Sequence, residues 1–80
     1  MNLDDSETKM LDLRGLFCPE PVFRAKSEIE SIKVGECLRI LADDPAAEED
    51  ISRWAKRTGQ ELLSFRKDGK NLTFLVKRAR

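Results

Sequence analysis

Hydrophobic and polar positions alternate along this chain with two different periods, and the changes of period divide the chain into six elements. Alternation with a period of two predicts strands over residues 9–14, 36–41, 61–67 and 70–78. Apolar residues at helical spacing predict amphipathic helices over residues 20–32 and 44–58. The order is therefore β-α-β-α-β-β. Residues 1–8 are expected to form a flexible tail before a single domain of residues 9–80.

Residues that suit helix ends and turns mark the boundaries of these elements. Asp44 can cap the second helix, Pro45 suits its first position, and Gly59 can end it. The first helix is expected to close at the turn of residues 33–35. Asp68-Gly69, between the last two strands, predicts a two-residue hairpin turn of type I′.

The order of elements also predicts how the layers stack. The first β-α-β crossover should be right-handed and join parallel strands, which places both helices on one face of a four-stranded mixed sheet. The fold class is therefore α/β (α+β), a two-layer sandwich. The strand residues expected to face the helices are Leu11, Leu13, Leu38, Ile40, Leu63, Phe65, Leu72, Phe74 and Val76. The residues expected on the opposite, open face are Asp12, Cys37, Arg39, Arg66, Leu75 and Lys77.

The helices are expected to bury one stripe each. The stripe of the first helix contains Val22, Ala25, Ile29 and Ile32, and that of the second contains Ala47, Ile51, Trp54, Ala55 and Thr58. Trp54 is thus expected to be a core residue.

Composition fits one small globular domain. The 80 residues are 40% hydrophobic and 38% charged, with fifteen basic and fifteen acidic side chains. Residues 1–50 carry six basic and thirteen acidic side chains, whereas residues 51–80 carry nine and two. We hypothesise that this polarity orients successive protein partners.

The same composition excludes several classes of protein. No apolar run is long enough to span a membrane, and the acidic first nine residues resemble neither a secretory signal nor a transit peptide. A cytoplasmic protein with free thiols is therefore expected, and no membrane partner. The sequence contains no histidine and no tyrosine, so its chemistry must use thiol, carboxylate or cationic groups.

The segment Cys18-Pro19-Glu20-Pro21 is chemically the most informative. Two prolines so close together fit only the first turn of a helix, which places Cys18 at the N-cap with its sulfur near the N–H groups of Glu20 and Val22. The helix dipole is then expected to lower the thiol pKa from near 8.5 to about 7.3. Without an imidazole, such a thiolate suits exchange at sulfur better than acyl transfer. The alternative is that Cys18 is a small apolar residue at a helix start.

Four segments together form a more specific pattern. They are Leu13-Arg14-Gly15-Leu16-Phe17-Cys18-Pro19-Glu20-Pro21, Gly35-Glu36, Ala42-Asp43-Asp44-Pro45-Ala46 and Asp50-Ile51. From about Met10 to Arg78, the chain resembles the TusA/SirA-like sulfur carriers. The resemblance implies a fold like the C-terminal domain of translation initiation factor 3. It also implies a persulfide on Cys18 and a helix start shaped by Pro19, Glu20 and Pro21. Gln60 departs from the family, which often has histidine there.

The resemblance further implies which proteins exchange the sulfur. The donor is expected to be a cysteine desulfurase or a rhodanese, and the acceptor another protein cysteine. The destinations implied are tRNA 2-thiolation, molybdenum-cofactor biosynthesis and sulfur oxidation. The chain is then a sulfurtransferase-like carrier and not a self-sufficient enzyme.

Other residues carry alternatives. Cys37 begins a strand, about 17 to 20 Å from the strand end that precedes Cys18, whereas a disulfide tolerates only about 7 Å between Cα atoms. It is expected to be a structural or open-face residue, the alternatives being a resolving thiol or a redox switch. The acidic run of Asp43, Asp44, Glu48, Glu49 and Asp50 suits a helix start better than a metal site. Neither a metal nor another cofactor is expected.

Two surface hypotheses remain. Phe17 and Phe23 either form an apolar docking rim around Cys18 or pack in the core. The basic open face (Arg39, Arg66 and Lys77) suggests an alternative function as a regulatory or nucleic-acid-binding module. Direct nucleic-acid binding is not expected, because the strand aromatics should face inward and leave no stacking platform.

Overall fold

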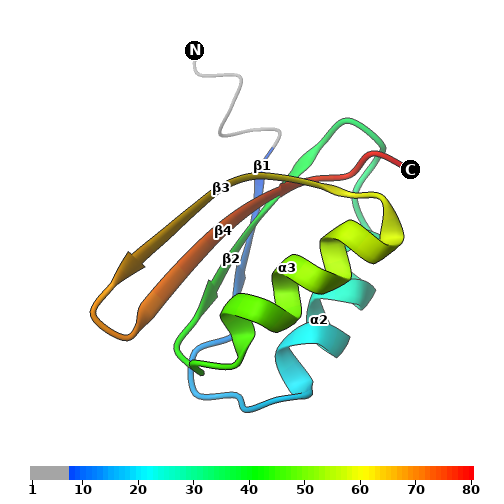
Figure 1. Cartoon of the computed structure of the whole chain (residues 1–80). Helices are drawn as coiled ribbons and strands as arrows, with labels where there is room; N and C mark the ends of the chain where they lie inside the picture. The colour runs from blue at the N-terminus through cyan, green and yellow to red at the C-terminus, as the bar shows by residue number, and fades with distance from the viewer. Residues whose placement is uncertain (1–7) are drawn as a thin grey trace.

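A computed structural model describes residues 8–80, and its strands and helices follow the predicted order (Figure 1). The elements are β1 (Thr8–Asp12), α2 (Glu20–Ile29), β2 (Cys37–Ala42), α3 (Ala47–Thr58), β3 (Glu61–Asp68) and β4 (Asn71–Lys77). Thr8 already pairs with Cys37 as the first residue of β1. The rest of the predicted tail, residues 1–7, lies outside the described residues.

The sheet is mixed, with strand order β1-β2-β4-β3. β1 and β2 are parallel, and β4 is antiparallel to both β2 and β3. Both helices cover one face, which confirms the two-layer sandwich (Figure 1). Because β1 and β2 are parallel and each leads into its helix, α2 and α3 begin at the same end of the sheet. Within residues 8–80, neither helix is long and apolar enough to cross a membrane.

The core lies between the sheet and the helices. The buried apolar residues are Leu13, Ala25, Ile29, Ile32, Leu38, Ile40, Ala42, Ala47, Ile51, Trp54, Ala55, Leu72, Phe74 and Val76. Leu11, Val22 and Phe65 are partly buried against them. Phe65 and Phe74 contact each other across the strand pair, with ring centroids 5.1 Å apart. Ala25, Ile29 and Ile32 of the first predicted stripe and Ala47, Ile51, Trp54 and Ala55 of the second are buried, whereas Val22 and Thr58 are only partly buried. Trp54, only 2% exposed, is a core residue.

β3 departs from the prediction at Leu63, which is 49% exposed instead of facing the helices. The register with β4 shifts between Leu62 and Ser64. Such a bulge adds one residue to the strand and breaks the alternation with a period of two. Leu62, and not Leu63, consequently lies opposite the buried Val76.

The ends of two other elements also differ from expectation. α2 ends at Ile29 and not at Ile32, although Ile32 remains buried in the turn that follows. Asp68 pairs with Asn71, so the hairpin loop is residues 69–70. In this loop only the glycine has a positive φ, of 62°, whereas a type I′ turn requires positive φ at both positions. The predicted end of α3 is confirmed, since Gly59 is its C-cap with a φ of 79°.

The open face holds the expected residues. The strand register arranges the residues of this face in three rows across the sheet. The middle row is Met10, Arg39, Leu75 and Ser64. The rows on either side are Asp12, Leu41, Thr73 and Arg66, and Thr8, Cys37, Lys77 and Glu61. Cys37 begins β2, whereas Cys18 follows the opposite end of β1, and both cysteines are free thiols. The predicted placement of the two cysteines at opposite ends of the sheet is therefore confirmed.

Phe74→Ala tests the position of the core. Phe74 is fully buried in the central strand β4, so its truncation should lower the free energy of unfolding by about 3 to 5 kcal/mol. Urea unfolding followed by Trp54 fluorescence measures this loss. Phe23→Ala is the matched control, because a side chain that is 59% exposed should cost no more than about 0.5 kcal/mol. Equal losses in the two variants would contradict the assignment of the core.

Candidate functional site

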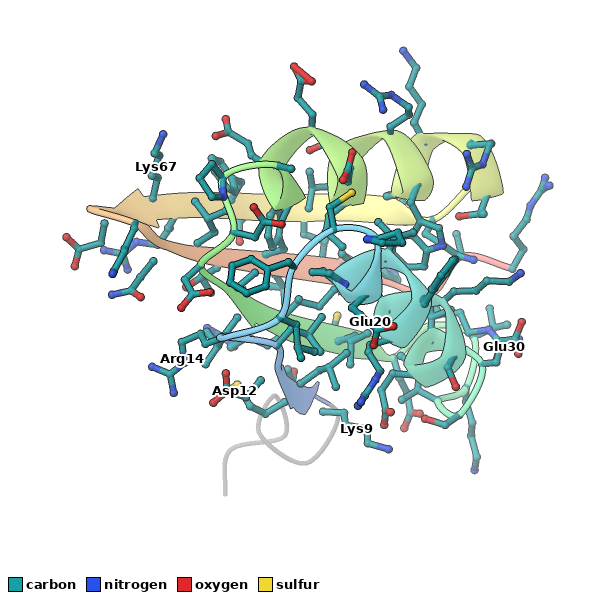
Figure 2. All side chains as sticks on the ribbon, turned by 90° about the horizontal axis from the view of Figure 1, so that it is seen from below. Lys9, Asp12, Arg14, Glu20, Glu30 and Lys67 are labelled. Carbon is teal, nitrogen blue, oxygen red and sulfur yellow. The ribbon has the colours of Figure 1, made fainter. Side chains whose placement is uncertain are left out.

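The loop between β1 and α2, residues 13–19, crosses the end of the sheet where both helices begin. Figure 2 views the molecule from this side, with Glu20 labelled at the start of α2. Leu13 anchors the loop, because its side chain is buried and its N–H donates to the Leu41 carbonyl at 2.7 Å. Leu16 packs against the core as a second anchor. Phe17 and Cys18, which follow, are left exposed.

The two prolines fit the start of α2, although the helix begins one residue later than expected. Pro19 is the N-cap, so Cys18 lies before the helix and not at its cap. Pro21 is the second helical residue and is buried. Neither missing N–H weakens the helix, because the first-turn N–H groups have no partner within a helix. The Glu20 N–H donates to the Phe17 carbonyl at 2.9 Å, so it is not available to the sulfur.

Two acidic residues in the turn before α3 hold the Cys18 loop in place. Asp43 Oδ1 accepts the Gly15 N–H at 2.9 Å, and Asp44 Oδ2 accepts the Cys18 N–H at 2.7 Å. Asp44 also accepts the Ala46 N–H at 3.2 Å through its other oxygen. The predicted cap is corrected here: α3 begins at Ala47, its N-cap Ala46 makes no side-chain bond, and Asp44 bridges the loop instead.

The Cys18 thiol itself faces Asp50, in the first turn of α3. Sγ donates a hydrogen bond to Asp50 Oδ2 at 3.0 Å. This bond raises the pKa of Cys18 above its ordinary value, with smaller contributions from desolvation and from the negative charges of Asp50 and Asp44. The predicted lowering of the pKa is therefore wrong. A carboxylate holds the thiol proton where the sequence pattern suggested free helix N–H groups.

A hollow of about 190 Å³ opens beside the thiol, between α2 and α3. Its lining includes Cys18, Phe23, Asp50, Arg53, Trp54 and Arg57. Arg53 Nη1 lies 3.7 Å from Asp50 Oδ1, so cationic groups share the hollow with the carboxylate and the thiol.

Two aromatic side chains stand exposed next to Cys18. Phe17 is 72% exposed and Phe23 is 59% exposed. Core packing, one of the two readings of these residues, is therefore wrong.

Sequence reasoning placed Cys18 and its prolines but missed the carboxylates and arginines around them. Asp43, Asp44 and Asp50 were assigned only to the start of a helix. The available signal was topological, since residues that follow two adjacent parallel strands meet at the same sheet edge. Within residues 8–80, no three cysteine or carboxylate side chains are arranged to hold a metal ion.

Comparison with known proteins identifies the family. The family model described as "Sulfurtransferase TusA" matches residues 9–78. The chain belongs to the TusA family. The "Sulfur carrier protein TusA" of Allochromatium vinosum is 38% identical over 69 residues, which cover 86% of this chain and 91% of that protein. An Archaeoglobus fulgidus protein that carries a sulfur-carrier name is 56% identical over 71 residues, with coverage of 86% and 91%.

A solved structure supports the TusA fold. The crystal structure of a SirA-like protein from Desulfitobacterium hafniense superposes with a TM-score of 0.76, covering 89% of this chain and 97% of that one. The two sequences are 22% identical, so this likeness concerns the fold. Membership of the TusA family gives the chain a general role in carrying sulfur.

Gln60, which the sequence resemblance marks as a departure, has a structural role in this chain. Its Oε1 accepts the Ala79 N–H at 2.7 Å, and its Nε2 donates to the Arg80 carbonyl at 3.4 Å. Gln60 therefore holds the residues that follow β4 beside the end of α3.

Asp50→Asn tests the control of the thiol. Removing the carboxylate charge should lower the Cys18 pKa, because a thiolate no longer lies beside an anion. Iodoacetamide alkylation near pH 7.5, in a Cys37→Ser background, should become about threefold to tenfold faster. The midpoint of the pH–rate profile should move to lower pH. Glu49→Gln is the control, since Glu49 is 82% exposed and lies one residue away without bonding the thiol. An unchanged or slower rate in Asp50→Asn would refute this account.

Proposed function

We propose that this chain carries sulfane sulfur as a persulfide on Cys18. The observation that supports this best is the exposed thiol at the meeting point of two helix starts, beside an open hollow. A second sulfur, about 2 Å from Sγ, would find room there. The absence of histidine from the sequence fits this chemistry, because sulfur exchange needs no imidazole.

Loading begins when Cys18 loses its proton and attacks the terminal sulfur of a donor persulfide. A bond forms between Cys18 Sγ and that sulfur, and the sulfur–sulfur bond of the donor breaks. The donor cysteine leaves as a thiolate and takes up the proton that Cys18 gave up. Sulfur moves at one oxidation level, so no external oxidant or reductant is consumed.

Unloading repeats this exchange in the opposite role. An acceptor thiolate attacks the terminal sulfur, and Cys18 leaves as a thiolate. The thiolate then regains its proton and its hydrogen bond to Asp50. Because the pKa of Cys18 is raised, the empty carrier rests as a thiol, and a thiol is the less reactive form.

The partners proposed are proteins on both sides of the relay. A cysteine desulfurase or a rhodanese supplies the sulfur in the cytoplasm, and an acceptor cysteine takes it toward tRNA 2-thiolation, molybdenum-cofactor biosynthesis or sulfur oxidation. Pro19, Glu20 and Pro21 shape the loop that presents the thiol. Phe17 and Phe23 dock the partners, a role supported by their exposure next to Cys18.

Sulfur loading tests the proposed carrier site. Incubation with a cysteine desulfurase and cysteine should add about 32 Da, one sulfur atom, to the wild type, and a reductant should remove it. Intact-protein mass spectrometry measures the addition, and peptide mapping assigns it to Cys18. Cys18→Ser should remain unloaded, and Cys37→Ser should load normally. Equal loading of Cys18→Ser would eliminate the proposal, and loss in Cys37→Ser alone would identify the other thiol.

The docking rim has its own test. Phe17→Ala and Phe23→Ala should leave the fold and polysulfide loading intact, since both side chains are exposed. Loading by the desulfurase should slow about tenfold, because apolar contact with the partner is lost. Val34→Ala, which removes another exposed apolar side chain (62%), is the control. If both phenylalanine variants exchange sulfur with the desulfurase at the wild-type rate, the rim has no docking role.

A further inference from the structure

The seam between α2 and α3 is hollowed at two places, and Trp54 contributes to both. The first hollow lies beside Cys18. The second, of about 170 Å³, is lined by Lys26, Ile29, Trp54, Thr58, Arg78 and Arg80 among others. Trp54 lines each of them although it is only 2% exposed, so it forms part of the floor of both.

The two hollows follow one another along the same face of α2. On α2, Val22 lines the first hollow, and Lys26 and Ile29, four and seven residues later, line the second. Residues at this spacing lie on one face of a helix. Both helices begin at the same end of the sheet, so their facing sides stay together along their length (Figure 1). We call the two hollows together the seam groove.

The charge of the seam groove changes along its length. At the Cys18 end, Asp50 faces the thiol. Farther along, Arg57, Lys26 and Arg80 line the groove, and within residues 8–80 these three make no ion pair. Glu30, labelled in Figure 2 near the far end of α2, is the acidic residue of the second hollow. The groove is therefore cationic away from the thiol.

We propose that the seam groove binds an acidic segment of the sulfur donor or acceptor protein. The partner cysteine lies at Cys18, and its carboxylates lie on Arg57, Lys26 and Arg80. The inference rests on the proposed function, because sulfur transfer requires the carrier to bring a cysteine of the partner protein up to Cys18. A twelve-residue helix such as α3 is about 18 Å long. An extended partner segment of about five or six residues would span that length.

The surroundings of the thiol favour a protein segment over a nucleic acid. Asp44 and Asp50 contact Cys18 directly, and their charges would repel a phosphate chain that reached the thiol. Phe17 and Phe23 add exposed apolar surface at the same end. A segment with an uncharged cysteine end and an acidic remainder matches both parts of the groove.

Peptide binding tests the groove. The probe is a blocked peptide of sequence Cys-Gly-Gly-Glu-Asp-Glu, and Trp54, the single tryptophan, reports its binding by fluorescence. The wild type should bind it, and Lys26→Glu/Arg57→Glu should bind about tenfold more weakly. The milder Lys26→Gln/Arg57→Gln should fall between them. Arg39→Glu is the matched control, because it reverses an exposed cation on the open face of the sheet.

Specificity has two further controls. A peptide with lysine in place of each acidic residue should not bind, and binding of the acidic peptide should weaken as salt rises. Equal binding of the peptide by the wild type and by Lys26→Glu/Arg57→Glu would overturn the proposal that the seam groove binds an acidic segment. So would an equal loss in Arg39→Glu. A third overturning result is an oligouridylate that binds through Lys26 and Arg57 while the acidic peptide does not.

Polysulfide loading separates failure of the groove from failure of the proposed function. Inorganic polysulfide needs no docking surface, so Lys26→Glu/Arg57→Glu and Arg39→Glu should both still gain one sulfur on Cys18. If the wild type cannot be loaded on Cys18 by any donor, the carrier function fails. If loading is normal but the charge-reversed variant binds the peptide as tightly as the wild type does, only the proposed groove is refuted.

Discussion

The parallel pairing of β1 with β2 is the constraint on which the site depends. It brings the loop after β1 and the turn after β2 to one edge of the sheet. Asp43 and Asp44 can then bond the backbone of Gly15 and Cys18, residues that lie far away in the sequence. An antiparallel pair would have sent these two segments to opposite ends. The loop that bears Cys18 is therefore held by side chains of the turn between β2 and α3.

The site balances two opposing electrostatic effects. Helix starts favour anions, and two of them meet near Cys18. The sequence, however, places carboxylates at the start of α3, and Asp50 bonds the sulfur directly. A direct charged contact outweighs a partial dipole charge at greater distance, so the thiol is stabilised in its protonated form.

The periodicity of the sequence was sufficient to predict the fold, because most of the pattern that defines each element lies within that element. The stripes of α2 and α3 and the alternation of β2 and β4 each follow from spacing within one element. Leu63 was misplaced because a bulge depends on the register of two strands, which no single strand displays. Cys18 and its prolines were recognisable as a contiguous motif. Asp50 was not recognised as their neighbour, because its contact joins residues 32 positions apart.

The bulge in β3 also affects how the molecule meets other sheets. β3 is an edge strand, and its Leu62 and Leu63 are 36% and 49% exposed. A flat edge with such side chains is a template on which another chain can add a strand and aggregate. The bulge interrupts the even row of backbone groups that such addition requires, and Arg66 and Lys67 add charge along the same edge. The bulge in β3, which breaks the alternation of apolar and polar residues, thereby protects the domain from uncontrolled polymerisation.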